Sequence, residues 1–195
     1  TEYLDAETKA QWWMATKLSQ AVGIPDAYRK SPSDCYLAIR MAHQIGIEPL
    51  AFMQRSYPVK GKIGIEGQLY IGVMNSSGIY KHGIGYKLTG EGMARKCVAY
   101  GQRADNDEIE SAEVSMQMAD KEGWLGKAGS KWQTMPDHML KLRAGAFLVR
   151  EYHPELVLGL TPIEEIVDVD GAQVVRRRRT SDLNATLQNV RIEDA

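Results

Sequence analysis

The sequence predicts an α+β fold that forms one core domain followed by a tail. Some segments repeat apolar residues every three or four positions, which is the spacing of an amphipathic helix. Others alternate apolar and polar side chains, as strands with one solvated face do. A length of 195 residues with 44% hydrophobic residues is enough for one core. We expect residues 1–170 to form the core domain and residues 171–195, which lose the apolar rhythm, to form a linker or tail.

The first half of the chain is expected to be mainly helical. An amphipathic helix is predicted for residues 5–22, where a Gly-Ile-Pro sequence stops it. A second helix is predicted for residues 33–46, because a serine and an aspartate at its start can cap free N–H groups. Residues 52–59 and 63–65 flank a short Lys-Gly-Lys connection and are expected to form a hairpin. A short helix is predicted for residues 67–74.

Strands are expected next. Residues 113–118 alternate between polar and apolar side chains, which indicates a strand with one wet face. Its expected partner is the strand at residues 94–103, and the polar residues 104–107 between them form a turn. The two strands therefore form an antiparallel hairpin.

The most clearly marked helix covers residues 136–152. It begins with Pro136, a residue favoured in the first turn, and a His-Pro pair ends it. We expect Thr134 to cap this helix. A similar arrangement of Thr161, proline and two glutamates predicts a short final helix.

Charge is balanced overall but not locally. The chain has 24 basic and 25 acidic residues. Eight basic and two acidic residues lie between Arg55 and Arg103, whereas residues 104–122 contain seven acidic residues and one basic residue. One interpretation is that these stretches form a positive and a negative face of the molecule. The other is that their charged side chains simply keep a hairpin and its neighbours solvated. In the first case, the acidic hairpin at residues 105–113 meets the basic face of the next subunit in an oligomer.

The helix at residues 136–152 carries two arginines on one face. Arg143 and Arg150 are seven residues apart, which places them about 10 Å from each other along the helix. Lys141 flanks them. Guanidinium groups on a helix suit phosphate oxygens. The alternative is that both arginines pair with carboxylates such as those of Glu151, Glu155 or Glu164.

Several kinds of chemistry have no sequence support. Neither Gly-Lys pair has the spacing of an ATP-binding phosphate loop, and the four histidines form no metal-spaced pair. No nucleophile elbow occurs, so we expect no enzyme and no cofactor.

Only Cys35 and Cys97 are present, which excludes a disulfide scaffold and favours the cytoplasm. No apolar run is long enough for a membrane helix, and the chain begins at Thr1, which we take as the ordered part of something longer.

A sequence motif extends from the segment before the long helix into the helix itself. Residues 131–140 read Lys-Trp-Gln-Thr-Met-Pro-Asp-His-Met-Leu, and Arg143-Ala144 and Arg150 follow. This resembles the RecT family of phage single-strand DNA annealing proteins (RecT/Red beta-like recombinases). The family signature is Trp-x-Thr-x-Pro-x-x-Met, a basic residue before Ala, and a second basic residue seven positions later. The resemblance covers approximately residues 33–168, through segments 42–49, 67–70 and 163–166.

The resemblance implies both a fold and a function. The fold is a small twisted antiparallel sheet packed against helices, with one long basic helix lining a DNA groove. The function is ATP-independent binding of single-stranded DNA and annealing of complementary strands in homologous recombination, by oligomeric rings or helical filaments in the cytoplasm of a bacterial host cell.

The resemblance also implies partners. They are single-stranded DNA, the annealed duplex and further copies of the chain. The family engages an exonuclease and the host single-strand binding protein through a C-terminal module, of which this sequence has no clear counterpart. The rival interpretations are a phage structural or scaffold oligomer without DNA activity and a nuclease.

The predicted DNA-binding residues lie on the long helix and in the basic strand region. Arg143 and Arg150 match the basic residues of the family, and Trp132 matches its tryptophan. An annealing protein has to hold the backbone and leave the bases free, so basic side chains should contact phosphates. Trp132 either stacks on a base or anchors the packing of the helix. The predicted set is Lys96, Arg103, Lys131, Trp132, Lys141, Arg143 and Arg150.

Overall fold

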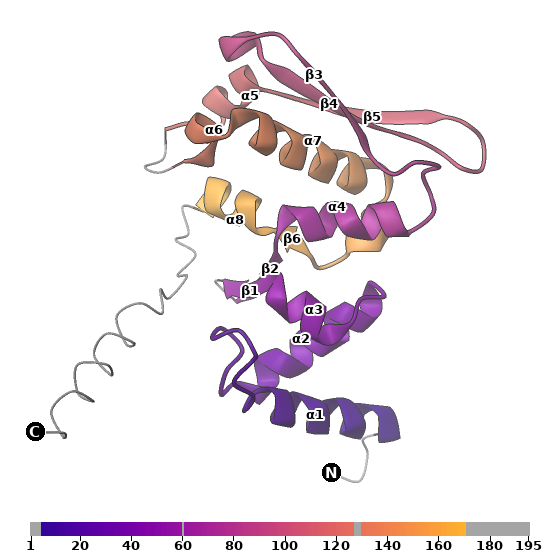
Figure 1. The fold of residues 1–195 in the computed structure, drawn as a ribbon, viewed down its shortest axis with the longest axis vertical. Coiled ribbons are helices and arrows are strands. Elements are labelled where there is room, and N and C mark those ends of the chain that lie inside the picture. Colours follow the sequence, from indigo (N-terminus) through magenta and orange to yellow (C-terminus); the bar gives the residue numbers. More distant parts are fainter. Residues whose placement is uncertain (1–4, 60, 127–129, 171–195) are drawn as a thin grey trace, which may run out of the picture.

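The computed structural model describes residues 5–59, 61–126 and 130–170. Its elements are stacked along one long axis, with helices at one end and a three-stranded sheet at the other (Figure 1). The predicted tail, residues 171–195, lies outside the described residues. The model is a mixed α+β structure, so the predicted fold class is confirmed.

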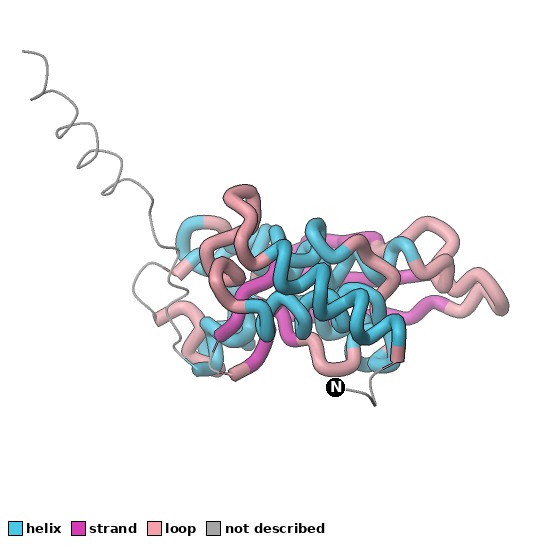
Figure 2. The backbone as a smooth tube through the Cα atoms, turned by 90° about the horizontal axis from the view of Figure 1, so that it is seen from below, coloured by secondary structure: helices cyan, strands magenta, loops and turns pink. Residues whose placement is uncertain are grey.

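The helical end consists of α1 (Ala6–Leu18), α2 (Pro32–Gln44) and α3 (Pro49–Gln54). Asp5 caps α1 by accepting a hydrogen bond from the N–H of Thr8 at 2.7 Å. The predicted strand from residue 52 was wrong in its first part, because Glu48 accepts from the N–H of Ala51 at 3.0 Å and starts α3. In Figure 2 these helices are seen from their own end of the molecule.

A small sheet follows the helical end. The predicted hairpin is confirmed as β1 (Ser56–Val59) and β2 (Lys62–Ile65), which pair antiparallel. The third strand, β6 (Thr161–Pro162), comes from much later in the chain and pairs with β2 in parallel over two residues. The predicted short helix is α4 (Gly67–Ser76), which begins directly after β2.

The sheet end has the strand order β3 (Gly85–Thr89), β4 (Lys96–Gln102), β5 (Ile109–Ser115), all antiparallel, with the short helix η1 (Gly92–Ala94) before β4. This confirms the predicted antiparallel hairpin. The predicted second strand was wrong beyond residue 115, because α5 (Met116–Lys121) begins there. The Ser115 hydroxyl accepts from the N–H of Met118 at 3.1 Å and caps that helix.

The last elements are α6 (Lys131–Thr134), α7 (Pro136–Tyr152), η2 (Pro154–Val157) and α8 (Ile163–Asp170). The predicted bounds of α7 are confirmed, but Thr134 is not its cap: Thr134 lies in α6, and Met135 precedes α7 without a side-chain cap. In Figure 1, α7 lies beneath the β3–β4–β5 sheet, and α4 and α8 lie on the side of α7 that faces away from this sheet.

Close packing of α7 depends on small residues. Ala144 and Ala146 are buried, and a Cβ on Gly145 would lie 2.8 Å from the Tyr86 hydroxyl and 3.1 Å from the Ile71 side chain. The helix can therefore lie close to both β3 and α4 only with glycine at this position. In the described part of the chain, no helix has the length and apolar character that a membrane crossing requires.

Candidate nucleic-acid interface

Arg143 projects from the middle of α7 and is buried, with a side chain only 4% exposed. Its guanidinium carbon lies 4.1 Å from the centre of the Trp124 ring, a cation–π distance. One Nη pairs with the Asp168 carboxylate, and the other lies 3.4 Å from Oε1 of Glu165. Both carboxylates come from α8. Arg143 is therefore held on all sides by this chain.

Trp132 is buried in the same cluster. Its Nε1 donates a hydrogen bond to Oδ2 of Asp168 at 3.1 Å, and its ring lies 5.2 Å from that of Trp124. Of the two interpretations of Trp132, the structure supports the packing anchor, because a fully covered ring has no face free for a base. Asp168 thus accepts from two residues of the sequence motif, Trp132 and Arg143.

Arg150 lies at the rim of this cluster. Its side chain is 45% exposed, and Nη2 donates to both carboxylate oxygens of Glu165 at 2.6 Å. It also hydrogen-bonds the Tyr70 hydroxyl on α4. Glu165 therefore bridges Arg150 and Arg143 along one face of α7, and the half-exposed Arg150 is the one of the two arginines that solvent reaches.

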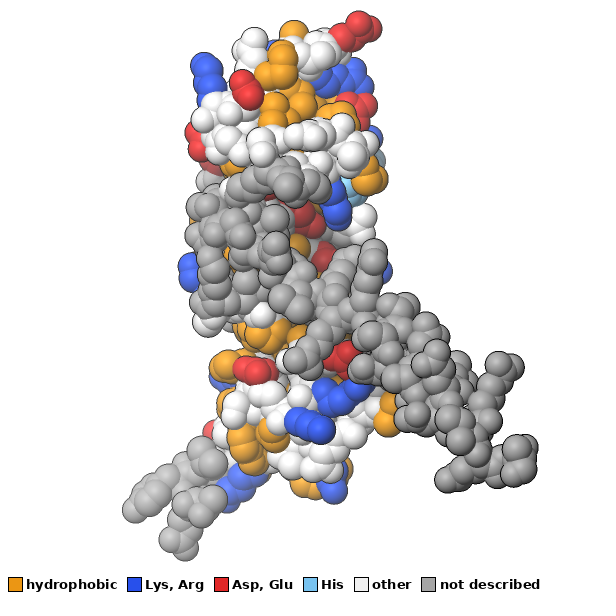
Figure 3. All heavy atoms as spheres, turned by 90° about the vertical axis from the view of Figure 1, so that its left-hand side faces the viewer, with side chains coloured by type: hydrophobic (Ala, Val, Ile, Leu, Met, Phe, Trp, Pro, Cys, Tyr) orange, Lys and Arg blue, Asp and Glu red, His pale blue; other side chains and the backbone are white. Residues whose placement is uncertain are grey.

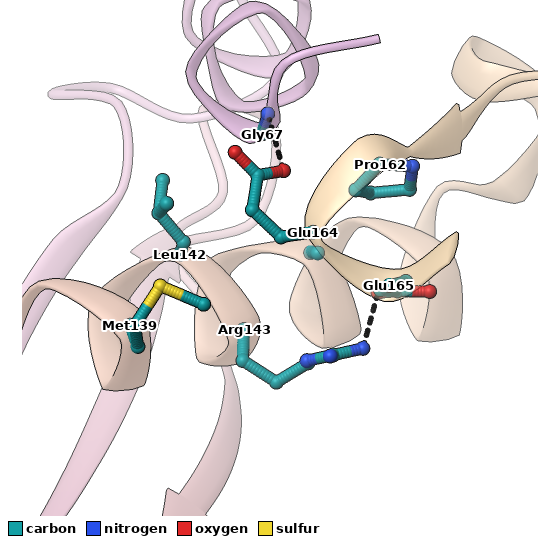
Figure 4. A pocket seen from close by; sticks show the side chains of 8 residues that line it. Gly67, Met139, Leu142, Arg143, Pro162, Glu164 and Glu165 are labelled. Atoms are coloured by element: carbon teal, nitrogen blue, oxygen red, sulfur yellow. Dashed lines mark hydrogen bonds and ion pairs between the residues drawn. The ribbon is translucent and has the colours of Figure 1, made fainter. Parts of the chain in front are cut away.

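Glu164, unlike Glu165 and Asp168, accepts a hydrogen bond from a backbone N–H rather than from an arginine. The N–H of Gly67, in the first turn of α4, donates to Oε2 of Glu164 at 2.9 Å (Figure 4). The N-terminus of a helix favours an anion at this position. Burial nevertheless raises the pKa of Glu164 above its ordinary value, since the charged form loses water. Three carboxylates of α8, those of Glu164, Glu165 and Asp168, thus face donors on α4, α6 and α7.

The DNA groove predicted along Arg143 and Arg150 is therefore not open in this structure. The helical spacing correctly placed both arginines on one face, but α8 covers that face. The alternative of carboxylate pairing describes the structure better, although the carboxylates differ from those named from the sequence. Glu165 and Asp168 pair with the arginines, Glu164 binds Gly67, and Glu155 lies 3.4 Å from His153.

The predicted strand residues lie away from this cluster. Lys96 pairs with Glu113 on the neighbouring strand at 2.8 Å. Arg103 pairs with Asp105 at 2.6 Å and with Glu110 at 3.1 Å, at the far end of the hairpin. The structure does not bring them together with Arg143, and both are already compensated within the sheet.

Two predicted lysines remain on the surface. Lys131 on α6 and Lys141 on α7 are exposed. Lys131 is close enough to Glu164 to lower its pKa against the larger effect of burial. Lys141 lies near Asp137, whose pKa is held below its ordinary value chiefly by the side-chain hydrogen bonds from Arg95, with Lys141 adding to the effect. Together with Arg150, these are the cationic groups of the motif region that solvent reaches.

The acidic hairpin is largely compensated within the chain. Asp105 pairs with Arg103, Asp107 with Lys81, and Glu113 with Lys96. These pairs leave little uncompensated negative charge for another subunit. The Lys96–Glu113 pair joins two strands and follows from their pairing, whereas Arg103 and Asp105 are only two positions apart and could have been paired from the sequence.

A second buried cluster was not predicted. Glu110 accepts hydrogen bonds from Tyr80 at 2.7 Å and from Arg103 at 3.1 Å, and lies 2.8 Å from Nε2 of His153. Burial opposes its ionisation, but these hydrogen bonds hold the pKa of Glu110 below its ordinary value. The cluster fixes the end of α7 to the hairpin. The sequence did contain a signal for this cluster: Glu110 is in phase with the apolar Ala112 and Val114, which face inward in the alternating strand.

An open hollow of about 990 Å³ lies beside the start of α7. In Figure 3 hydrophobic side chains gather at the top of the view, at the end of the molecule that carries the β3–β4–β5 sheet. Of the predicted residues, Trp132 alone lines the hollow, and the Arg95–Asp137 pair sits in its wall. The other lining residues are mostly apolar and include Met93, Met116, Leu125 and Met135. This surface therefore does not resemble a phosphate-binding site.

Comparison of the sequence with protein-family models gives no match, and comparison with curated proteins finds none of significant similarity. Within residues 5–59, 61–126 and 130–170, no group of three or more His, Cys, Asp or Glu side chains is arranged to hold a metal ion.

Proposed function

We propose that this protein binds single-stranded DNA by its sugar-phosphate backbone and anneals complementary strands without ATP. The observation that supports this most is the unit formed by the RecT-like motif. Trp132 and Arg143 meet at one carboxylate, and Arg150 continues the same face. The motif residues therefore pack together as one structural unit around α7, and this supports the proposal.

Three cations of the motif region are available to a DNA backbone, and Lys141, which lies near Asp137 and nine residues before Arg150, is on the opposite side of α7 from Arg150. Lys131, Lys141 and Arg150 reach solvent, while the aromatic side chain of the motif is covered. Cations without an exposed aromatic platform at this point favour contacts to phosphates over stacking on bases. Bases left free in this way can pair with a second strand, which is what annealing requires.

Assembly into oligomers is the second part of the proposal. Large apolar side chains are exposed at both ends of the molecule: Trp13 is 64% exposed on α1, and Ile109 is 67% exposed on the hairpin. Exposed apolar groups of this size are often contact points between subunits. A chain with such groups at opposite ends can associate head to tail and extend a DNA track.

The test is a binding titration of a fluorescently labelled poly-dT oligonucleotide at several salt concentrations. We expect log Kobs to fall linearly with log salt, by about 0.7 for each phosphate contact on a single strand. Lys131→Ala and Lys141→Ala should each weaken binding and reduce the slope by about that amount. Lys9→Ala on α1, an exposed lysine at the other end of the molecule, is the matched control and should change neither.

The rival functions give different results in the same preparation. A scaffold protein forms oligomers but shows no salt-dependent oligonucleotide binding. A nuclease shortens the oligonucleotide when Mg²⁺ is added, which a denaturing gel detects. Either result would reject the proposed function.

A further inference from the structure

Helix α8 places its carboxylates on the donors that a DNA backbone would use. Glu165 accepts from Arg150, and Asp168 pairs with Arg143. Figure 4 shows the other two contacts, of Glu165 with Arg143 and of Glu164 with the N–H of Gly67 at the start of α4. We propose that α8 is a built-in competitor for this phosphate-binding surface, and that a bound single strand displaces it. This inference rests on the proposed function.

The chemistry of the two occupants is the same. A guanidinium group donates paired N–H bonds to a carboxylate or to a phosphate with similar geometry. The free N–H groups of a helix N-terminus also donate to either anion. Arg143 and Arg150 lie seven residues apart on α7, so a run of phosphates can replace Glu165 and Asp168 without leaving a buried cation unpaired. The exchange therefore conserves charge pairing.

Apart from its ion pairs and hydrogen bonds, α8 has few contacts to the rest of the chain among the described residues. The preceding strand β6 pairs with β2 through only two residues, Thr161 and Pro162. The apolar anchors of α8 are Ile163 and Ile166, which pack over Gly64 of β2. Burial of Glu164 also opposes its ionisation. A polyanion can take over the ion pairs of this acidic helix, and among the described residues the short strand and the two isoleucines are the contacts that would then still hold it.

Arg150 provides a starting point for the exchange. Arg143 is covered, but the Arg150 side chain is 45% exposed. A phosphate can therefore approach Arg150 first, compete for Glu165, and expose Arg143 as α8 leaves. The displaced α8 would also free the Gly67 N–H and the indole N–H of Trp132.

A disulfide can hold α8 in place. A Cβ built on Gly64 lies 3.7 Å from the Cβ of Ile163, within the range of disulfide-bonded cysteines. That Cβ has two close contacts: the Ile166 Cδ1 at 2.8 Å, which is the end of a flexible side chain and can shift, and the Ile163 Cγ1 at 3.3 Å, which the second substitution removes. The double variant Gly64→Cys, Ile163→Cys therefore joins the first residue of α8 to β2. Each single variant controls for its own substitution and for the buried Cys35 and Cys97.

The binding measurement uses labelled poly-dT with oxidised and reduced protein, and circular dichroism confirms that both forms are folded. We expect the oxidised double variant to bind at least tenfold more weakly than its reduced form, and the single variants to be insensitive to redox state. Equal binding by oxidised and reduced protein would overturn the displacement of α8 and leave the proposed function standing. If wild-type protein fails to bind at all, the proposed function is rejected and the inference falls with it.

Hydrogen exchange provides a second readout on the unmodified chain. We expect the backbone amides of residues 163–170 to exchange faster when poly-dT is bound, whereas those of α7 are unchanged or slower. Slower or unchanged exchange in α8 would show that the helix stays in place on the complex and would overturn the inference.

Discussion

Trp132 donates its indole N–H to Oδ2 of Asp168 at 3.1 Å, although the two residues lie 36 positions apart in the sequence. The same oxygen is paired with Arg143. One buried carboxylate therefore joins α6, α7 and α8. The packing of the motif region depends on this residue, which lies beyond the part of the motif that is most easily recognised in the sequence.

Asp168→Asn should destabilise the protein by about 3 kcal/mol, because it leaves the buried Arg143 without its closest counter-charge. Urea unfolding at neutral pH measures this loss. The matched control is Glu113→Gln, which breaks the exposed pair with Lys96 and should cost about 1 kcal/mol or less. Equal losses from the two variants would contradict the central place of Asp168.

Substitution of the two arginines of α7 should have different effects: one mainly on the stability of the fold and the other mainly on oligonucleotide binding. Arg143→Met removes a buried, stacked cation that pairs with the buried Asp168, so we expect a loss of about 3 kcal/mol in the free energy of unfolding. Arg150→Met removes a half-exposed cation, and the buried Glu165 keeps Arg143 at 3.4 Å, so the variant should cost less, about 1 kcal/mol. Arg150→Met should nevertheless weaken oligonucleotide binding measurably at moderate salt. Unchanged binding would remove Arg150 from the DNA surface.

Two helical glycines should respond in opposite ways to alanine. Gly72 on α4 has no atom within 4 Å of a new Cβ, so Gly72→Ala should stabilise the protein by about 0.5–1 kcal/mol through helix propensity. Gly145→Ala places a methyl group 2.8 Å from the Tyr86 hydroxyl and should cost about 1–3 kcal/mol. Thermal unfolding of the two variants tests this, and a stabilised Gly145→Ala would show that α7 does not pack closely against β3.

The Glu110 cluster predicts a pH dependence. Its folded-state pKa is depressed, so the stability it contributes is present above the ordinary glutamate value of 4.5 and is lost as the pH falls through the folded value. At pH 7, Glu110→Gln should cost about 2 kcal/mol, because hydrogen bonds to a buried charge are lost. Urea unfolding in increasingly acidic buffers should show the difference from wild type shrinking below pH 4.5. The exposed Glu108→Gln is the control, and a pH-independent difference at Glu110 would argue against its ionised state.

For Glu164 we expect the opposite pH dependence of stability. Burial raises its folded-state pKa, so its contribution to stability is full below the ordinary value of 4.5 and is lost as the pH rises through the folded value. Glu164→Gln keeps an acceptor for the Gly67 N–H and removes the buried charge. We expect its melting temperature to exceed that of wild type at pH 7 and the two to converge below pH 4.5. A lower melting temperature at pH 7 would show that the charge itself stabilises α8.

Much of the fold could be predicted from local signals. The bounds of α7 follow from Pro136 and from the His153-Pro154 pair, and the hairpin turn follows from its polar residues. The errors lie in short segments. Residues 116–118 fit an alternating pattern, and residues 52–54 precede a hairpin connection, but the side chains of Ser115 and Glu48 cap helices there. In such a short segment, a single capping hydrogen bond decides between helix and strand, and the spacing of apolar residues does not reveal that bond.

The candidate site was less predictable because it is built from distant parts of the chain. Helical spacing put Arg143 and Arg150 on one face, and that was correct. Their partners come from α8, which β6 places by pairing with β2, and no local pattern reveals that pairing. Glu165 and Asp168 are three positions apart on one short helix, so an acidic face could have been noticed, but not the surface that it covers.

The most direct test of the proposed activity is strand annealing followed by energy transfer between dyes on two complementary oligonucleotides. The assay contains wild-type protein and neither ATP nor Mg²⁺, and a sample without protein gives the spontaneous rate. The account predicts pairing many times faster than the spontaneous rate, with the acceleration decreasing as salt is raised. Pairing at the spontaneous rate, in protein shown to be folded, would contradict it.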